Sequence, residues 1–135
     1  MNHMLYLLVG LGGIAGAVCR YLLGIWVGAG MLFPFSTFLI NLFGCFILAF
    51  FYTLTTARFT VHPYFRLSFG TGFVGSFTTF STFSYETLEF IHHSHYIFAI
   101  LYTTASLIGG YFCSYLGVKL GSYEKKQFSQ ESGKK

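Results

Sequence analysis

The chain has 135 residues, enough for one domain, of which 54 % are apolar and only 9 % are charged. Soluble domains carry about 25 % charged residues, so this composition excludes an ordinary water-soluble protein. The net charge of +4 comes largely from the C-terminal end, which is too short and plain for a nucleic-acid surface with interleaved aromatic residues. We therefore expect an integral membrane protein that binds no nucleic acid.

Four apolar runs follow one another along the chain, each close to or above the ~20 residues that a helix needs to cross a bilayer. They predict transmembrane helices over residues 4–27, 35–56, 65–90 and 96–120. Glycine and proline mark the gaps between them, and the last gap holds a histidine cluster at His92, His93 and His95. The predicted fold is all-α, with a four-helix transmembrane domain over residues 1–122 and a polar, basic tail over residues 123–135.

Two features of the apolar runs have simple interpretations. The first run has no basic segment ahead of it and no small-residue cleavage site, so it is a retained helix rather than a signal peptide. Cys19, Cys45 and Cys113 lie inside apolar runs at unrelated spacings, which favours packing or lipid-facing positions over disulfides or metal ligands.

The first predicted helix carries Gly12, Gly16, Arg20 and Gly24 at four-residue spacing, which places them on one face. Small residues at this spacing let helices approach closely, so this face is expected to be buried in protein. An arginine inside an apolar run is costly in lipid. Arg20 either reaches a lipid headgroup from the end of its helix or places a positive charge at a vestibule for anions.

Asn41 is the strongly polar residue of the second helix, and Thr37 lies one turn before it. An asparagine at membrane depth can join two helices by hydrogen bonds worth about 1 kcal/mol. Its amide also carries N–H donors, which a small anion stripped of water would seek. Both interpretations stay open.

The third helix is irregular, because Gly70, Gly72 and Gly75 fall in its middle and a hydroxyl-rich run follows them. We expect a break at membrane depth between Gly75 and Thr78. Backbone groups freed there must be satisfied by protein or must line a cavity. In transporters and channels such breaks bring carbonyls to cations and helix N-termini to anions.

Two stripes of side chains could line a path beside this break. Phe77, Phe80 and Phe83 follow it at three-residue spacing, and they either pack or turn the positive edges of their rings toward an anion. On the fourth helix, a hydroxyl stripe either cross-links helices or offers a ladder of donors. This stripe comprises Tyr102, Ser106, Gly110 and Ser114. Separately, the carboxylates of Glu86 and Glu89 lie at the end of the third helix, near the membrane interface.

Together these segments resemble the bacterial fluoride-exporter family, the small fluoride channels called Fluc or CrcB. The resemblance covers nearly all of the chain except the tail. It is carried by the glycine motif of residues 12–17 with Arg20 and Tyr21, and by Asn41 with Gly44. Its most specific part is the run of residues 72–84, GFVGSFTTFSTFS, followed by Glu86.

The resemblance implies a passive, fluoride-selective channel that exports fluoride from the cytoplasm and relieves its toxicity. It also implies an antiparallel, dual-topology dimer of four-helix subunits with the third helix broken at mid-membrane. A structural sodium ion, Na+, which is not transported, would lie on the two-fold axis between two fluoride pathways. The protein would be a multi-pass protein of the inner (plasma) membrane of a bacterium, in contact with lipid, and not an enzyme.

The resemblance also assigns roles to single residues. Backbone carbonyls of Gly75 and Thr78 would hold the sodium ion, and Arg20 would lie at the vestibule. Gly110 stands where some family members carry another hydroxyl, so one donor of the stripe is missing here. The fluoride pathway would comprise Asn41, Phe80, Phe83, Tyr102, Ser106, Ser114, Thr37 and Glu86.

Three other functions can be weighed against this one. A small proton-coupled exporter of cationic drugs would need a buried acidic residue in the first helix, whereas the charge there is Arg20. A structural subunit of a larger membrane complex would leave the broken, hydroxyl-rich segment without a use. An enzyme would need a nucleophile, a base and an orienting group, and the mid-membrane residues do not supply them.

The positive charges bear on membrane orientation. Arg58, Arg66 and five lysines near the C-terminus all fall on the side of the two termini, and these lysines are Lys119, Lys125, Lys126, Lys134 and Lys135. The positive-inside rule then favours cytoplasmic termini, whereas insertion in both orientations normally needs an even balance. Either the chain overrides this bias and forms an antiparallel homodimer, which we favour, or it forms a heterodimer with an oppositely oriented homologous subunit.

Overall fold

The computed structural model describes the backbone of residues 2–28, 33–57 and 61–132, and the side chains of residues 3–27, 33–56 and 61–123. Arg58, Lys134 and Lys135, and the side chains of Lys125 and Lys126, lie outside the described residues, so that part of the orientation argument is not addressed. The elements are α1 (Asn2–Gly28), α2 (Phe35–Ala57), α3 (Pro63–Leu67), the π-helix η1 (Ser68–Val74), α4 (Gly75–Phe77), α5 (Phe80–His92) and α6 (Tyr96–Ser132).

Among the described residues, three helical segments are long and apolar enough to cross a membrane, namely His3–Val27, Phe35–Thr56 and Tyr96–Tyr123. Large apolar side chains on them point outward, and Trp26 and Leu107 are 88 % and 71 % exposed. Exposed apolar surface of this kind suits lipid as the solvent. The predicted all-helical membrane protein is confirmed, and α1 and α2 begin and end close to their predicted bounds.

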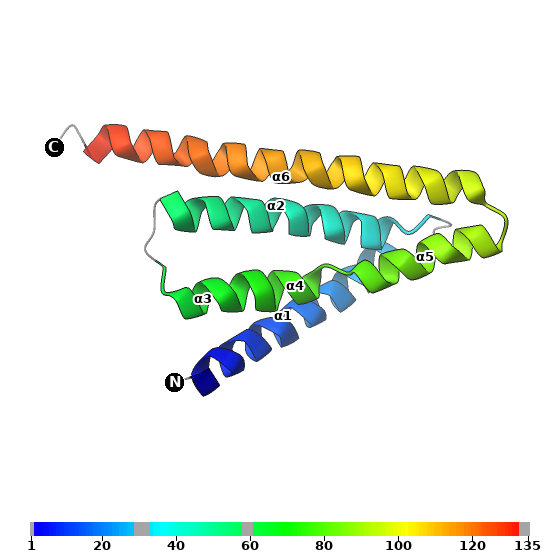
Figure 1. Ribbon diagram of the computed structural model, residues 1–135, viewed down its shortest axis with the longest axis horizontal. Helices are drawn as coiled ribbons and strands as arrows, with labels where there is room; N and C mark the ends of the chain where they lie inside the picture. The colour runs from blue at the N-terminus through cyan, green and yellow to red at the C-terminus, as the bar shows by residue number, and fades with distance from the viewer. Residues whose placement is uncertain (1, 29–32, 58–60, 133–135) are drawn as a thin grey trace.

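The helices form a bundle with two distinct ends. Figure 1 shows α2 between α6 and the run from α3 to α5, with α1 crossing that run. The start of α1, the end of α2, the start of α3 and the end of α6 lie at one end, whereas the α5–α6 turn lies at the other. Within the bundle, α1 packs on η1 and α4, and α6 packs on α2 and α5.

The close approach of α6 to α2 depends on a glycine face of α6, which consists of Gly109, Gly117 and Gly121. A Cβ atom added at Gly109 would lie 2.9 Å from Leu42, and one at Gly117 would lie 2.6 Å from the backbone oxygen of Phe46. A side chain at Gly117 would therefore force the two helices apart, whereas one at Gly109 would displace the flexible end of Leu42. These glycines are spaced by eight and four residues on the helix that also carries the hydroxyl stripe, and this spacing could have predicted the close contact from the sequence.

The helix α6 continues to Ser132, so its predicted end at residue 120 is wrong. No glycine or proline stands between Gly121 and Ser132, and Glu124 to Gln127 are all strong helix formers. The apolar segment ends where a membrane would end, but nothing in the sequence ends the helix there. The separate tail over residues 123–135 stays a prediction.

The segment predicted as the third helix, residues 65–90, runs from Pro63 to His92 and is interrupted at Thr78 and Thr79, at the end of the range in which the break was expected. The glycines do not break it, because Ser68–Val74 forms a π-helix, a wider turn that keeps the backbone hydrogen-bonded. The helix ends at Phe77 instead. Thr78 and Thr79 are extended, with φ/ψ of −75°/158° and −145°/122°, and α5 starts at Phe80.

The glycine face of α1 contacts η1 over part of its length. A Cβ atom at Gly12 would collide with the carbonyl oxygen of Ser68, and one at Gly16 would collide with that of Phe73. Ser76 also donates a hydrogen bond of 2.6 Å to the backbone oxygen of Gly13 on α1. The predicted close contact is confirmed for Gly12 and Gly16, whereas no described residue of this chain lies within 4 Å of a Cβ atom at Gly24, and the burial of that glycine stays a prediction.

Candidate functional site

A cavity of about 370 Å³ lies where α2, η1 and α6 meet the break between α4 and α5. Asp, Glu, Lys and Arg are missing from the described residues that line it. Phe80, which lines it, is 80 % exposed, so the cavity opens at the surface of the chain. The structure brings six of the predicted site residues together in this lining: Asn41, Gly75, Thr78, Phe80, Phe83 and Ser106.

Asn41 joins α2 to the break through two hydrogen bonds with one residue. Its side-chain Nδ2 donates to the backbone oxygen of Thr79 at 3.0 Å, and the Thr79 backbone N–H donates to Asn41 Oδ1 at 2.9 Å. Asn41 therefore joins two segments of the chain, as the first of the two interpretations of this residue predicted. Because a primary amide has two N–H groups and the described residues accept from one, the other can still serve a ligand in the cavity.

The break withdraws hydrogen bonds from two backbone carbonyls that were predicted to hold a cation. In a continuous helix the N–H of Thr79 would donate to the oxygen of Gly75, and that of Thr82 to the oxygen of Thr78. Here Thr79 donates to Asn41, and Thr82 donates to Thr79 Oγ1 at 3.2 Å. Gly75 and Thr78 both line the cavity, and unwound carbonyls of this kind suit Na+.

The described residues hold no group of three or more His, Cys, Asp or Glu side chains that could bind a metal ion.

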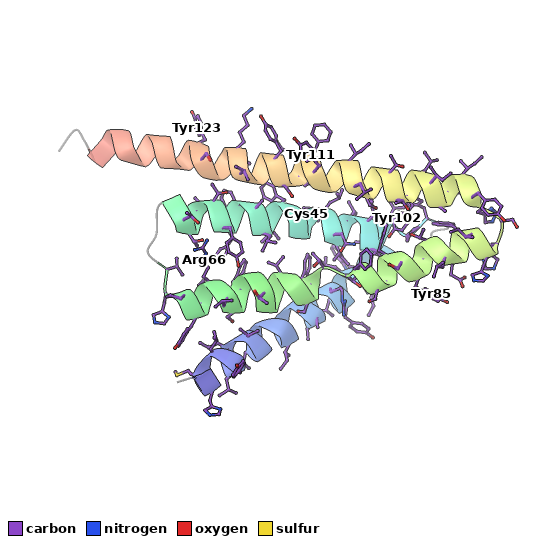
Figure 2. The ribbon with its side chains drawn as sticks, viewed as in Figure 1. Cys45, Arg66, Tyr85, Tyr102, Tyr111 and Tyr123 are labelled. Atoms are coloured by element: carbon purple, nitrogen blue, oxygen red, sulfur yellow. The ribbon has the colours of Figure 1, made fainter. Side chains whose placement is uncertain are left out.

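Glu86 on α5 binds side chains from two other helices. Thr37 on α2 donates to its Oε1 at 2.7 Å, and Tyr102 on α6 donates to its Oε2 at 2.8 Å. Thr37 is only 4 % exposed, and Tyr102, which Figure 2 labels, is fully buried. Buried hydroxyls need such partners, so one carboxylate holds α2, α5 and α6 together next to the cavity.

The phenylalanine stripe divides into two parts. Phe77 is buried and stacks on Phe73 with ring centroids 6.0 Å apart, as the packing interpretation expected. Phe80 and Phe83 line the cavity instead, with ring centroids also 6.0 Å apart. The Phe83 ring lies 5.0 Å from that of Tyr102, which connects the aromatic pair to the hydroxyl stripe of α6.

The hydroxyl stripe of α6 cross-links helices at Tyr102, which bonds Glu86 on α5, but it does not do so at every position. Ser106 lines the cavity, and its buried Oγ has no hydrogen-bond partner among the described residues. Ser114 is not in the cavity lining but lies near Cys45 on α2. Cys45, predicted as a packing or lipid-facing residue, lines the cavity as well, and its place one turn after Asn41 was the available signal.

Arg20 is not part of the cavity lining. Its side chain is partly exposed on α1, and within the described residues it makes no hydrogen bond or ion pair. Its role at a vestibule or at a lipid headgroup stays a prediction. Glu89 lies one turn beyond Glu86 and contacts His93, with a carboxylate oxygen 3.7 Å from the imidazole Nδ1.

Residues 7–118 match the family described as CrcB-like protein, Camphor Resistance (CrcB). A protein of Bacillus cereus named Fluoride-specific ion channel FluC 1 is 44 % identical over 133 residues, which cover 97 % of each chain. The protein of Oceanobacillus iheyensis named Fluoride-specific ion channel FluC is 46 % identical over 121 residues, 90 % of this chain and 94 % of that one. The FluC of Acidobacterium capsulatum is 43 % identical over 88 % of this chain and 97 % of its own. Since these matches extend over most of the sequence, the chain belongs to the CrcB family, a family of ion channels and not of enzymes.

Proposed function

We propose that this chain forms a passive, fluoride-selective channel that carries fluoride out of the cytoplasm. The observation that supports it best is the cavity at the helix break, which offers weak donors and aromatic rings without a charged side chain. Relatives of nearly the same length carry the name of fluoride-specific ion channels.

The chemistry of the cavity suits a small, strongly hydrated anion. Fluoride leaves water only where close donors replace its hydration shell, because an unpaired charge in a low-dielectric site is costly. The unpartnered hydroxyl of Ser106 and the second N–H of Asn41 are such donors. The ring edges of Phe80 and Phe83 carry partial positive charge and add weak contacts. Several weak contacts allow an ion to leave as readily as it enters.

The carbonyls of Gly75 and Thr78 would hold a structural sodium ion, together with the same carbonyls of a second subunit. When bound, that cation would supply the positive charge that offsets the cost of an anion at low dielectric. The residues of this chain prepare the site, because Asn41 and Thr79 take up the N–H groups that would otherwise bond these two carbonyls.

The proposed channel is an antiparallel dimer in which the run from α3 to α5 forms a fourth membrane crossing, broken at mid-membrane. Phe80 is exposed beside the open cavity, and a second subunit would cover both. Arg66 and Lys119 lie toward the end that carries the termini, and this charge bias supports one preferred orientation of the chain in the membrane. For that reason, a homologous second subunit of opposite orientation stays the alternative to an identical one.

Ion release from liposomes that contain only the purified chain tests this function. Fluoride-loaded liposomes are expected to release fluoride without a proton gradient, whereas chloride-loaded ones retain chloride. Equal release of the two ions would contradict selectivity, and release that depends on a proton gradient would instead favour a coupled exporter. If fluoride leaves only after a homologous subunit is added, the identical dimer is wrong and the mixed dimer holds.

A further inference from the structure

The hydroxyl stripe of α6 is interrupted at Gly110, which has no side chain. Ser106 and Ser114 lie on either side of this position, and eight residues of helix separate them by ~12 Å along the axis. A small anion cannot contact both hydroxyls across such a distance. The stripe therefore supplies a continuous series of donors only if another element fills the place opposite Gly110.

Cys45 on α2 fills that place. Its Sγ atom lies 3.5 Å from the position of a Cβ atom at Gly110, which is ordinary van der Waals contact. Ser114 lies near the thiol, and Cys45 lines the same cavity as Ser106. Figure 2 shows Cys45 on α2, the helix alongside α6. The thiol thus connects the cavity to the far part of the stripe.

Close packing between α2 and α6 does not require this thiol. The positions that need the smallest residues form the glycine face of α6, which meets Leu42, Phe46 and Thr53 rather than Cys45. Gly110 leaves more room, and the group opposite it is a weak S–H donor. We infer that Cys45 is a lining residue of the fluoride pathway, and that its thiol replaces the donor that the stripe lacks at Gly110. This inference rests on the proposed fluoride channel.

The test compares initial rates of fluoride release from liposomes for wild type and four variants. Cys45→Ala removes the donor, and since one hydrogen bond changes an equilibrium or a rate by roughly fivefold, we expect a decrease of that size. Cys45→Ser puts a stronger donor in the same place and should rescue the alanine defect. In the double variant Cys45→Ala/Gly110→Ser, the donor returns from α6, and the rate is again expected to recover. Cys19→Ala makes the same change on α1, away from the cavity, and serves as the matched control.

The outcomes separate this inference from the proposed function. If wild type releases no fluoride, the proposed function fails. If wild type releases fluoride and Cys45→Ala releases it equally fast, the inference is overturned. It is also overturned if Cys45→Ser and the double variant are both as slow as Cys45→Ala, because the thiol then matters only for shape. Should Cys45→Ala not elute as a folded protein, the two donor-restoring variants decide, and slow release by both overturns the inference.

Discussion

The two neighbours of α2 are held by opposite chemistry. On one side, α6 approaches through Gly109, Gly117 and Gly121, and the contact is close, apolar and free of side chains on the α6 side. On the other side, the break between α4 and α5 is held by Asn41, which bonds both backbone groups of Thr79. The difference follows from the backbone, because a continuous helix satisfies its own N–H and C=O groups and an interrupted one does not. Shape therefore dominates the first contact, and hydrogen-bonding capacity dominates the second.

The largest expected effect comes from adding volume to the glycine face. Gly117→Leu places a Cβ atom 2.6 Å from the backbone oxygen of Phe46, which cannot move out of the way as a side chain can. We expect no folded protein, measured as loss of the monodisperse peak in size-exclusion chromatography in detergent. Gly24→Leu is the matched control, since nothing lies within 4 Å of that glycine in the chain, and it should elute as wild type. Normal elution of Gly117→Leu would show that shape does not govern this contact.

A smaller effect on folding is expected at the break. Asn41→Leu keeps the volume but leaves the N–H and C=O of Thr79 without partners, at a cost of about 2 to 4 kcal/mol. The protein should fold, unfold at a clearly lower temperature, and release no fluoride from liposomes. Asn41→Asp keeps the acceptor for the Thr79 N–H but loses the donor, so its unfolding temperature should lie between those of the wild type and Asn41→Leu. It should also fail to conduct, because a second negative charge repels the anion. Unchanged thermal unfolding of both variants would mean that Asn41 does not hold the break.

The smallest effect on folding is expected at the cavity mouth. Phe80→Ile should change the free energy of unfolding of the single subunit by less than about 0.5 kcal/mol, since Phe80 is 80 % exposed within it and exposed positions contribute little. Phe83→Ile loses a contact with the Tyr102 ring and should cost about 1 kcal/mol. Both variants should nevertheless cut fluoride release at least tenfold, because isoleucine keeps apolar bulk but has no positive ring edge. Thermal unfolding and liposome efflux, measured on the same preparations, check this. Release at the wild-type rate in either variant would assign that ring to packing.

The sequence predicted helix types and positions better than helix ends. Apolar runs set the extent of α1 and α2, because lipid selects continuous apolar helices of a fixed length. It misjudged the glycines of η1, since a π-helical turn satisfies the backbone as well as an α-helical turn does, and composition does not distinguish the two. It also misjudged the end of α6, where apolar character stops but helix propensity does not.

The sequence by itself determined that the chain is a helical membrane protein, which residue types could serve an anion, and that a polar, glycine-rich segment interrupts an apolar one. Only the tertiary structure decided which groups are left free to bind. Asn41 and Thr79 are 38 residues apart, a separation that no helical period relates, and their pairing takes the N–H of Thr79 away from the carbonyl of Gly75. Likewise, Cys45 and Cys19 are both cysteines in apolar helices, and only the packing of α2 against α6 places Cys45 opposite Gly110. Contacts between distant segments depend on the angle and separation at which helices pack, and the local sequence pattern does not specify these two quantities.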